Sequence, residues 1–307
     1  QTTPETTPTP SRPHTDDALA LHQALAERAA QADPFGDALA ESLQICADAL
    51  RLYGPERLVT SFNGGKDAVA VLHLMRAALA RHCADADAQP TAVPLSVIYF
   101  GNAEEFPEVE AFVDATVERY GLDLISYTNL GFAAGLARCI EQRSSAAFVL
   151  GTRNGDPNAA GQAAFTPSSD WMPPFMRVNP ILPWRSADVW ELPRALELPC
   201  CKLYERGYTS LGKTSNTSPN PALLLPGGGY RPAWELADEA LERAGRSSAT
   251  AAAGAATADS AAAATIGEDG RLVGASAGLL IVGDEILGGK ISDGNTRLAA
   301  SKLRRGG

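Results

Sequence analysis

Residues 58–67 constrain the fold of this chain more than any other stretch. Residues 58–62 are mostly apolar, β-branched or aromatic, and the turn signal Asn63-Gly64-Gly65 follows them, which predicts a buried strand. A helix is expected to begin at Asp67 or at Lys66 just before it, because apolar residues recur downstream at helical spacing: Val71, Leu72, Met75 and Leu79. The chain therefore passes from a strand through two glycines directly into a helix.

This turn has the features of an anion-binding cradle. Two consecutive glycines let the backbone approach a phosphate, while free N–H groups and the positive end of the helix dipole face it. Lys66 adds a mobile cation. An ordinary tight turn with an exposed lysine is the alternative interpretation of the same local pattern.

Two common phosphate loops do not fit these residues. A P-loop requires a glycine five positions before Gly65, where this chain has Thr60. It also requires Ser or Thr after Lys66, where this chain has Asp67. The dinucleotide-binding fingerprint needs glycines spaced two and then three apart, whereas the glycines here are adjacent.

Composition excludes several classes of function. The 307 residues carry a net charge of −10, which argues against a nucleic-acid partner and means that an anionic nucleotide must be held by a few local cations. No apolar run approaches the ~18 residues of a membrane span. The five cysteines show no C-x-x-C spacing, so a reducing, cytoplasmic location without structural zinc or disulfides is expected. The chain does not begin with Met, which leaves an organellar form open.

The order of the remaining elements predicts an α/β fold. Helices are expected at 16–32 and after a break at 34–36, the second carrying Leu39, Leu43, Ile45 and Leu50 into the core. Strands at 95–100, 122–128 and 147–150 alternate with helices at 107–120 and 132–141, and Gly121 is expected to close the first of these as a left-handed cap. This rhythm predicts a mostly parallel sheet with helices on both faces, whose ligands bind at the carboxyl ends of the strands, near residues 63–67, 101–108 and 151–156.

The flanking segments are expected to be less regular. Residues 1–15 are rich in Pro and Thr and predicted to be disordered. Residues 151–183 lack regular periodicity but contain aromatic and charged residues, which favours a functional loop. A helix beginning at Ser186 should be kinked or stopped by Pro193, and a last helix is expected at 232–244. Residues 247–276 are read as an Ala/Ser-rich linker.

Two clusters of polar residues follow predicted strands. Residues 104–108, Glu-Glu-Phe-Pro-Glu, are either part of a ligand cleft or a solvated acidic helix start. In residues 151–157, Arg153 precedes Asp156 by three residues, which suits a phosphate clamp beside a magnesium ligand, while an ordinary Asn-Gly turn is the alternative. Trp184 and Trp190 are expected in the core.

Six motifs in order resemble eukaryotic FAD synthase, a branch of the PAPS-reductase-like, ATP pyrophosphatase (PP-loop) superfamily. The resemblance covers about residues 57–246 and is carried by the segments 61–67, 104–108, 151–157, 169–184, 203–221 and 230–246. The chain departs from the pattern at Ala68, where the superfamily has Ser, and at Pro193, inside a helix that usually lacks proline. A PAPS reductase would need a C-terminal cysteine, and no cysteine follows Cys201.

The resemblance implies an activity and a site. The fold would be that of adenine nucleotide α-hydrolase-like proteins with a C-terminal substrate-binding extension, and residues 16–246 would form the catalytic domain. The enzyme would be an FMN adenylyltransferase that uses ATP and FMN as substrates with Mg²⁺, yields FAD, and has flavoproteins as possible clients. The alternatives are another PP-loop adenylating enzyme, a PAPS reductase-like protein, or a non-catalytic nucleotide-binding protein.

Residue by residue, the resemblance and the motifs give the following assignments. The ATP-binding residues would be Ser61, Phe62, Asn63, Gly64, Gly65, Lys66, Asp67, Phe100, Gly151 and Arg153. The FMN-binding residues would be Glu105, Phe106, Asp156, Asp170, Trp171, Arg177, Arg243 and Arg246. Asp67, Asp156 and Arg243 would be catalytic, and Asp67 and Asp156 would hold the metal.

Two features of the C-terminal part complete the expectations. Arg243 and Arg246, three residues apart, should share one face near the end of the last helix and reach the phosphates, the alternative being a solvated helix end. Residues 277–307 are similar to the start of a molybdopterin-binding-like domain, cut short after about 30 residues, too few to form a core of their own.

Overall fold

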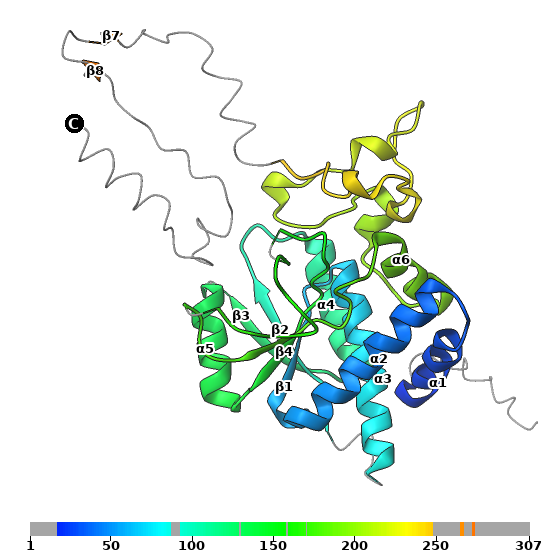
Figure 1. The fold of residues 1–307 in the computed structure, drawn as a ribbon. Helices are drawn as coiled ribbons and strands as arrows, with labels where there is room; N and C mark the ends of the chain where they lie inside the picture. The colour runs from blue at the N-terminus through cyan, green and yellow to red at the C-terminus, as the bar shows by residue number, and fades with distance from the viewer. Residues whose placement is uncertain are drawn as a thin grey trace, which may run out of the picture.

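A six-stranded sheet lies at the centre of the molecule. The protein's computed structural model describes residues 17–86, 93–128, 130–157, 159–169 and 171–247, and the backbone of residues 265–266 and 272–273. The strand order is β3-β2-β1-β4-β6-β5. The strands span Leu58–Ser61 (β1), Ser96–Gly101 (β2), Asp123–Thr128 (β3), Ala147–Val149 (β4), Phe165–Pro167 (β5) and Met176–Val178 (β6). All neighbours are parallel except β5 and β6 (Figure 1), so the predicted mostly parallel sheet is confirmed.

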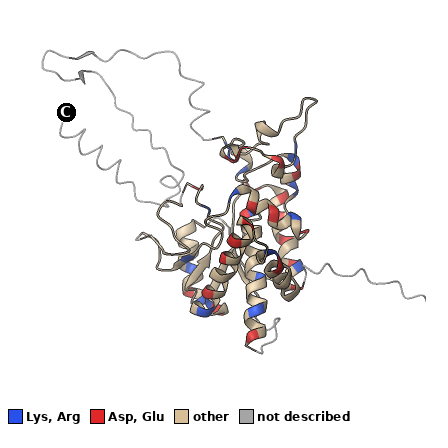
Figure 2. Cartoon of the chain, turned by 45° about the vertical axis from the view of Figure 1, so that its right-hand side comes forward, with Lys and Arg blue, Asp and Glu red and all other residues tan. Residues whose placement is uncertain are grey.

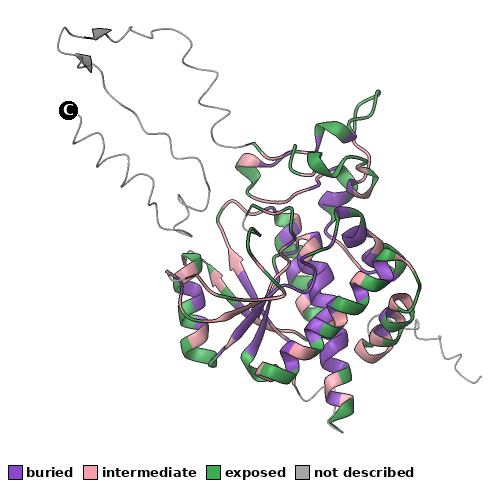
Figure 3. Ribbon diagram, in the orientation of Figure 1, coloured by how far each residue is buried: buried purple, intermediate pink, exposed green. Residues whose placement is uncertain are grey.

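Helices cover both faces of this sheet. They span Ala18–Ala29 (α1), Pro34–Tyr53 (α2), Lys66–Asp85 (α3), Pro107–Tyr120 (α4), Phe132–Arg143 (α5) and Ser186–Ala195 (α6). Successive strand residues alternate between two apolar cores: Leu58 faces the core shared with α2, α3 and α4, and Val59 faces a smaller core shared with α5. Figure 3 shows the buried residues filling the strands and the helix faces turned toward them.

Most of the predicted elements are present. The helix after the glycines begins at Lys66 as predicted, and Gly121 ends α4 in the left-handed conformation at φ 60°. Trp184 and Trp190 lie in the core, 3% and 6% exposed. Pro193 lies inside α6, which ends two residues later. All five cysteines are free thiols.

Three expectations about secondary structure are wrong. Residues 34–36 are not a break but the first turn of α2, because Asp33 caps that helix and Pro34 is tolerated at its start. Residues 151–183 contain the short strands β5 and β6, which are too brief to leave a periodic signal.

The expected helix at 232–244 is absent. Two 3₁₀ turns, Ala233–Glu235 and Glu239–Leu241, stand in its place. Between residues 233 and 244 only Ala233 is buried, so the segment has no apolar face that a helix could pack against the core.

Several expectations fall outside the described residues. These are the disorder of residues 1–15, the domain start at 277–307 and most of the linker at 247–276, within which β7 (Thr265–Ile266) pairs antiparallel with β8 (Leu272–Val273). Within the described residues, no helix is both long and apolar enough to cross a bilayer. Acidic and basic residues are interspersed along the helices in Figure 2.

Candidate active site

The loop between β1 and α3 has the geometry of an anion cradle. Asn63 folds its Oδ1 back to accept the Gly65 N–H at 3.0 Å, and Gly65 then opens α3. Gly64 adopts φ +73°, and a Cβ there would lie 3.3 Å from Val109 and Val113 of α4, so only glycine fits without strain. Phe62, expected among the ATP-binding residues, is fully buried in the core and contributes no side chain to the cradle.

Lys66 is buried rather than exposed, which removes the interpretation of an ordinary turn with a solvated lysine. Its backbone N–H donates to the hydroxyl of Tyr204 at 2.7 Å. Its side chain is only 3% exposed, and Nζ lies 2.7 Å from Asp67 Oδ2 and 2.6 Å from Glu242 Oε1. A buried ammonium with such partners is held in place at the helix N-terminus.

The end of β4 lies directly against this helix N-terminus. A Cβ on Gly151 would lie 3.0 Å from the carbonyl carbon of Asp67, so the close approach requires glycine. Arg153, 7% exposed, places Nε 2.7 Å from Asp67 Oδ1 and Nη2 2.6 Å from Glu242 Oε1. Burial opposes the charge of Arg153, but attraction to Asp67 and Glu242 raises its pKa.

Asp156 lies next to this pair. Its Oδ2 accepts the backbone N–H of Arg153 at 2.8 Å, and both Asp67 and Asp156 line the same pocket. The structure thus brings together the loop residues and the residues at the end of β4, as the strand order requires, since β1 and β4 are neighbours.

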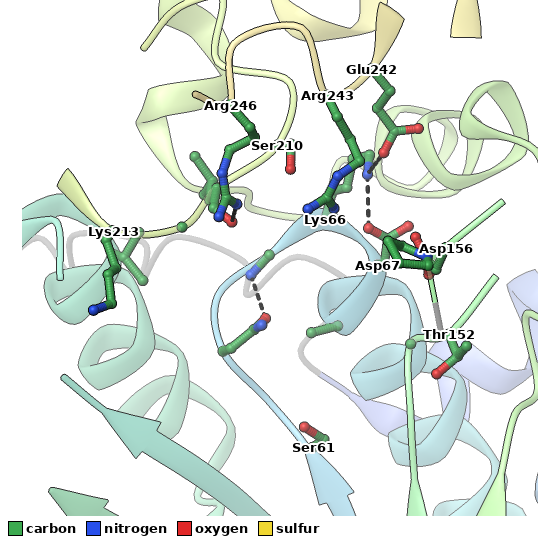
Figure 4. A pocket seen from close by; sticks show the side chains of 18 of the residues that line it. Ser61, Lys66, Asp67, Thr152, Asp156, Ser210, Lys213, Glu242, Arg243 and Arg246 are labelled. Carbon is green, nitrogen blue, oxygen red and sulfur yellow. Dashed lines mark hydrogen bonds and ion pairs between the residues drawn. The ribbon is translucent and has the colours of Figure 1, made fainter. Parts of the chain in front are cut away.

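Residues 239–247, here called the strap, close the pocket from above. Glu242, Arg243 and Arg246 of the strap line the pocket, and Figure 4 shows Glu242 and Arg243 on the side of Lys66 and Asp67, with Arg246 set apart from them. Arg246 Nη1 also donates to the Leu211 carbonyl at 2.7 Å. Both arginines therefore line the pocket that contains the cradle, but they are carried by a turn and not by one helix face.

Glu242 is the most strongly paired residue of the strap. Burial opposes its charge, but Lys66 and Arg153 outweigh this and lower its pKa to about 2. The carboxylate is consequently an anion at neutral pH and contacts both cations that the sequence assigns to phosphate binding.

The pocket has a volume of about 870 Å³, large enough for a nucleotide together with a second ligand. Its lining includes Glu105, two residues before α4 begins, and Ser61 at the end of β1; burial raises the pKa of Glu105. Phe106, expected beside the flavin, is 9% exposed and packs its ring edge-on against Tyr208 instead of lining the pocket.

A smaller apolar pocket of about 40 Å³ adjoins the first and shares Ser61, Phe132 and Leu150 with it. Phe100 and Arg177, both expected site residues, line this smaller pocket. Arg177 is fixed by Nη1 donating to the Pro167 carbonyl at 2.7 Å, and its burial lowers its pKa. Trp171 packs against the smaller core, which Val59 and α5 share, but it lines neither pocket. Asp170 lies outside the described residues.

Sequence reasoning missed several lining residues: Tyr204, Ser210, Lys213, Asn216 and Glu242. Glu242 could have been found, because a buried lysine and a buried arginine require more negative charge than Asp67 alone provides. Tyr204 and Ser210 carried no such signal, since their place in the pocket depends on the path of an irregular segment.

The acidic residues suit a magnesium ion that also contacts substrate phosphates. No group of three or more His, Cys, Asp or Glu residues gathers within the described part of the chain, so a metal site made of protein ligands alone is not found there. Mg²⁺ often binds through one or two carboxylates plus phosphates. Asp67 Oδ1 is buried and touches Arg153 Nε without the alignment of a hydrogen bond, so it retains lone pairs for such an ion.

Comparison with known proteins identifies similar chains. Residues 57–136 and 133–219 match the phosphoadenosine phosphosulfate reductase domain family. A probable FAD synthase of Schizosaccharomyces pombe is 38% identical over 208 residues, 68% of this chain and 78% of that protein. A probable FAD synthase of Caenorhabditis elegans is 36% identical over 222 residues, 69% of this chain but only 41% of that protein.

A solved structure shares the fold. The crystal structure of Candida glabrata FMN adenylyltransferase in complex with FAD and inorganic pyrophosphate superimposes with a TM-score of 0.67 at 23% identity. The superposition covers 76% of this chain and 97% of the Candida chain.

Proposed function

The chain belongs to the FAD synthase family, and on this premise we propose that it is an FMN adenylyltransferase, which converts ATP and FMN into FAD and pyrophosphate. One observation carries the proposal: Lys66, Asp67 and Arg153 meet within hydrogen-bonding distance at the glycine cradle, and Arg243 and Arg246 line the pocket that Lys66 and Asp67 also line. Such a site can hold the pyrophosphate part of a nucleotide while leaving room for a second phosphorylated substrate.

The chemistry requires positioning and charge neutralisation more than a base. The phosphate of FMN attacks the α-phosphorus of ATP in line, a new P–O bond forms, and the bond to the bridging oxygen of the leaving pyrophosphate breaks. A phosphate monoester is already an adequate nucleophile at neutral pH. The chain's task is to align the two substrates and to stabilise the negative charge that grows on the leaving group.

The cradle side of the pocket is suited to the leaving group. The Gly65 region offers backbone N–H groups and the positive end of α3, and Lys66 and Arg153 supply fixed cations. Because both cations are buried, their attraction for a phosphate is screened less than it would be at the surface. We assign these groups to the β- and γ-phosphates of ATP.

The strap side of the pocket is suited to the phosphate of FMN. Arg243 is exposed and lines the pocket, and Arg246 lines it as well. In a protein of net charge −10, these local cations are needed to draw two anionic substrates together.

Asp67 and Asp156 would hold Mg²⁺ together with the substrate phosphates. A magnesium ion there would neutralise phosphate charge and stabilise the leaving oxygen. Asp67 has the further role of keeping Lys66 and Arg153 in place through its two oxygens.

A PAPS reductase-like activity is the second candidate, since the matching domain family carries that name. The cysteines of the described residues give it no support, because none of them lines the pocket and Cys201 is only 1% exposed. We further propose a cytoplasmic location and direct transfer of FAD to flavoprotein clients, which rest on the reducing character of the cysteine pattern and on the nature of the product.

Release of pyrophosphate from labelled ATP tests the function. With FMN and Mg²⁺, equal amounts of pyrophosphate and FAD are expected, and none without FMN. Pyrophosphate release that is independent of FMN would indicate another adenylating enzyme, and binding without release would indicate a non-catalytic protein. Either result would overturn the assignment.

A further inference from the structure

One carboxylate already occupies the space between the two cations assigned to phosphate binding. Glu242 Oε1 lies 2.6 Å from Lys66 Nζ and 2.6 Å from Arg153 Nη2. A single anionic oxygen shared between a lysine and an arginine is also the arrangement that a phosphoryl oxygen would adopt at this site.

Lys66 and Arg153 would still have an anionic partner without Glu242. Asp67 already gives Oδ2 to Lys66 and Oδ1 to Arg153, each at 2.7 Å. With Glu242 in place the four side chains carry no net charge, and without it they carry a net charge of +1. The neutral cluster attracts a pyrophosphate group less than the cluster that has lost Glu242.

The carboxylate of Glu242 can move away from Lys66 and Arg153 without unfolding the strap. Its backbone is anchored, since the Glu242 carbonyl accepts the Thr209 hydroxyl at 2.6 Å and its N–H donates to the Glu239 carbonyl at 3.0 Å. Rotation about the side-chain bonds of Glu242 moves the carboxylate while these backbone contacts remain.

We propose that Glu242 is an internal competitor of the leaving group. Its carboxylate fills the position between Lys66 and Arg153 in the ligand-free protein, yields it to a phosphoryl group of the nucleotide, and returns as pyrophosphate departs. This inference rests on the proposed function for its role in turnover. It predicts that Glu242 weakens binding of pyrophosphate and speeds its release.

Equilibrium binding of inorganic pyrophosphate to the full chain tests the proposal, measured by calorimetry at pH 7.5 with and without Mg²⁺. Glu242→Gln keeps the size of the side chain and removes its charge, so pyrophosphate should bind about tenfold or more tightly. Glu242→Asp keeps the charge but shortens the side chain, so its affinity for pyrophosphate should lie between those of the parent protein and Glu242→Gln. Glu239→Gln is the matched control, because Glu239 lies on the same strap, accepts the Ala187 N–H at 3.1 Å, does not line the pocket, and should leave affinity unchanged.

Kinetics separate competition from a purely structural role. A competitor predicts that Glu242→Gln lowers KM for ATP and strengthens product inhibition by pyrophosphate, whereas a structural clamp predicts weaker binding and a higher KM. Unchanged or weaker pyrophosphate binding in both Glu242→Gln and Glu242→Asp would overturn the proposal. Tighter pyrophosphate binding in a protein that never makes FAD would uphold the competitor and reject the proposed function instead.

Discussion

The two sides of the pocket are built in different ways. The cradle side consists of the ends of β1 and β4 and the start of α3, which the sheet fixes through parallel strand pairing. The strap side consists of 3₁₀ turns, which buried polar side chains hold in place. Asn220, fully buried, donates its Nδ2 to the Leu241 carbonyl at 2.7 Å and to Thr209 Oγ1 at 2.9 Å.

This difference separates two kinds of function. Regular elements hold the charges that we assign to the leaving group in one geometry, because moving them would disturb the core. The strap depends on a few hydrogen bonds and on Gly245, where a Cβ would lie 2.3 Å from the Ser218 carbonyl oxygen. Such a segment can shift at a smaller cost in free energy, which suits the side of a site where substrates enter and products leave.

The largest effect is expected on the cradle side. Asp67→Ala should lower kcat/KM for FAD formation about 10²- to 10³-fold, because it removes the group that orients Lys66 and Arg153 and that would contact the metal. Asp85→Ala, at the exposed far end of the same helix, should leave turnover unchanged. Steady-state kinetics decide between these outcomes, and near-normal turnover of Asp67→Ala would remove this residue from the site.

A substitution on the strap side of the pocket should cause a smaller loss of kcat/KM. Arg243→Ala removes an exposed cation that lines the pocket, and a lost charged hydrogen bond of about 1.5–3 kcal/mol corresponds to a kcat/KM lower by about 10- to 100-fold. Arg206→Ala is the control, since Arg206 pairs with Glu108 outside the pocket. A change in KM for ATP but not for FMN would contradict the assignment of Arg243 to the FMN phosphate.

The hydrogen bonds of the strap can be weakened without touching a charged group. Asn220→Ala leaves the Leu241 carbonyl without its buried donor, which should cost about 2 kcal/mol of unfolding free energy and lower Tm by about 4–8 °C. Limited proteolysis should then cut within residues 236–247 faster than in the parent protein. An unchanged Tm together with unchanged proteolysis would show that the strap is held by other contacts.

The same two sides differ in how far the sequence predicts them. The cradle was predicted from local pattern, because β-branched residues, adjacent glycines and helical spacing each act over a few positions. Residues 232–244 were predicted as a helix and are not one, since their conformation is set by distant partners such as Asn220 and Thr209. The shared pairing of Glu242 with Lys66 and Arg153 spans 176 and 89 residues, beyond the reach of any local pattern.

The pH dependence of stability offers a finer test of the pairing between the two sides. The pKa of Glu242 falls from 4.5 to about 2 on folding, so its stabilising effect is fully present above about pH 4.5 and is lost as the pH falls toward 2. Between pH 7 and pH 3.5 the parent protein should lose about 1 kcal/mol more unfolding free energy than Glu242→Gln. Urea titrations at both pH values measure this difference, and equal losses would show that the carboxylate is not paired in the folded protein.

The smallest effect is expected beyond the strap. Arg246 is the last residue that lines the pocket among those described, and Ser247 N donates to the Asn216 carbonyl at 3.0 Å, which anchors the end of the strap. Deleting residues 250–307 should therefore leave kcat/KM and Tm nearly unchanged. Deleting residues 240–307 removes Glu242, Arg243 and Arg246 as well, and should abolish FAD formation. If the shorter deletion inactivates the enzyme while Arg243→Ala is fully active, the strap is not the C-terminal boundary of the site, and residues after 250 must complete it.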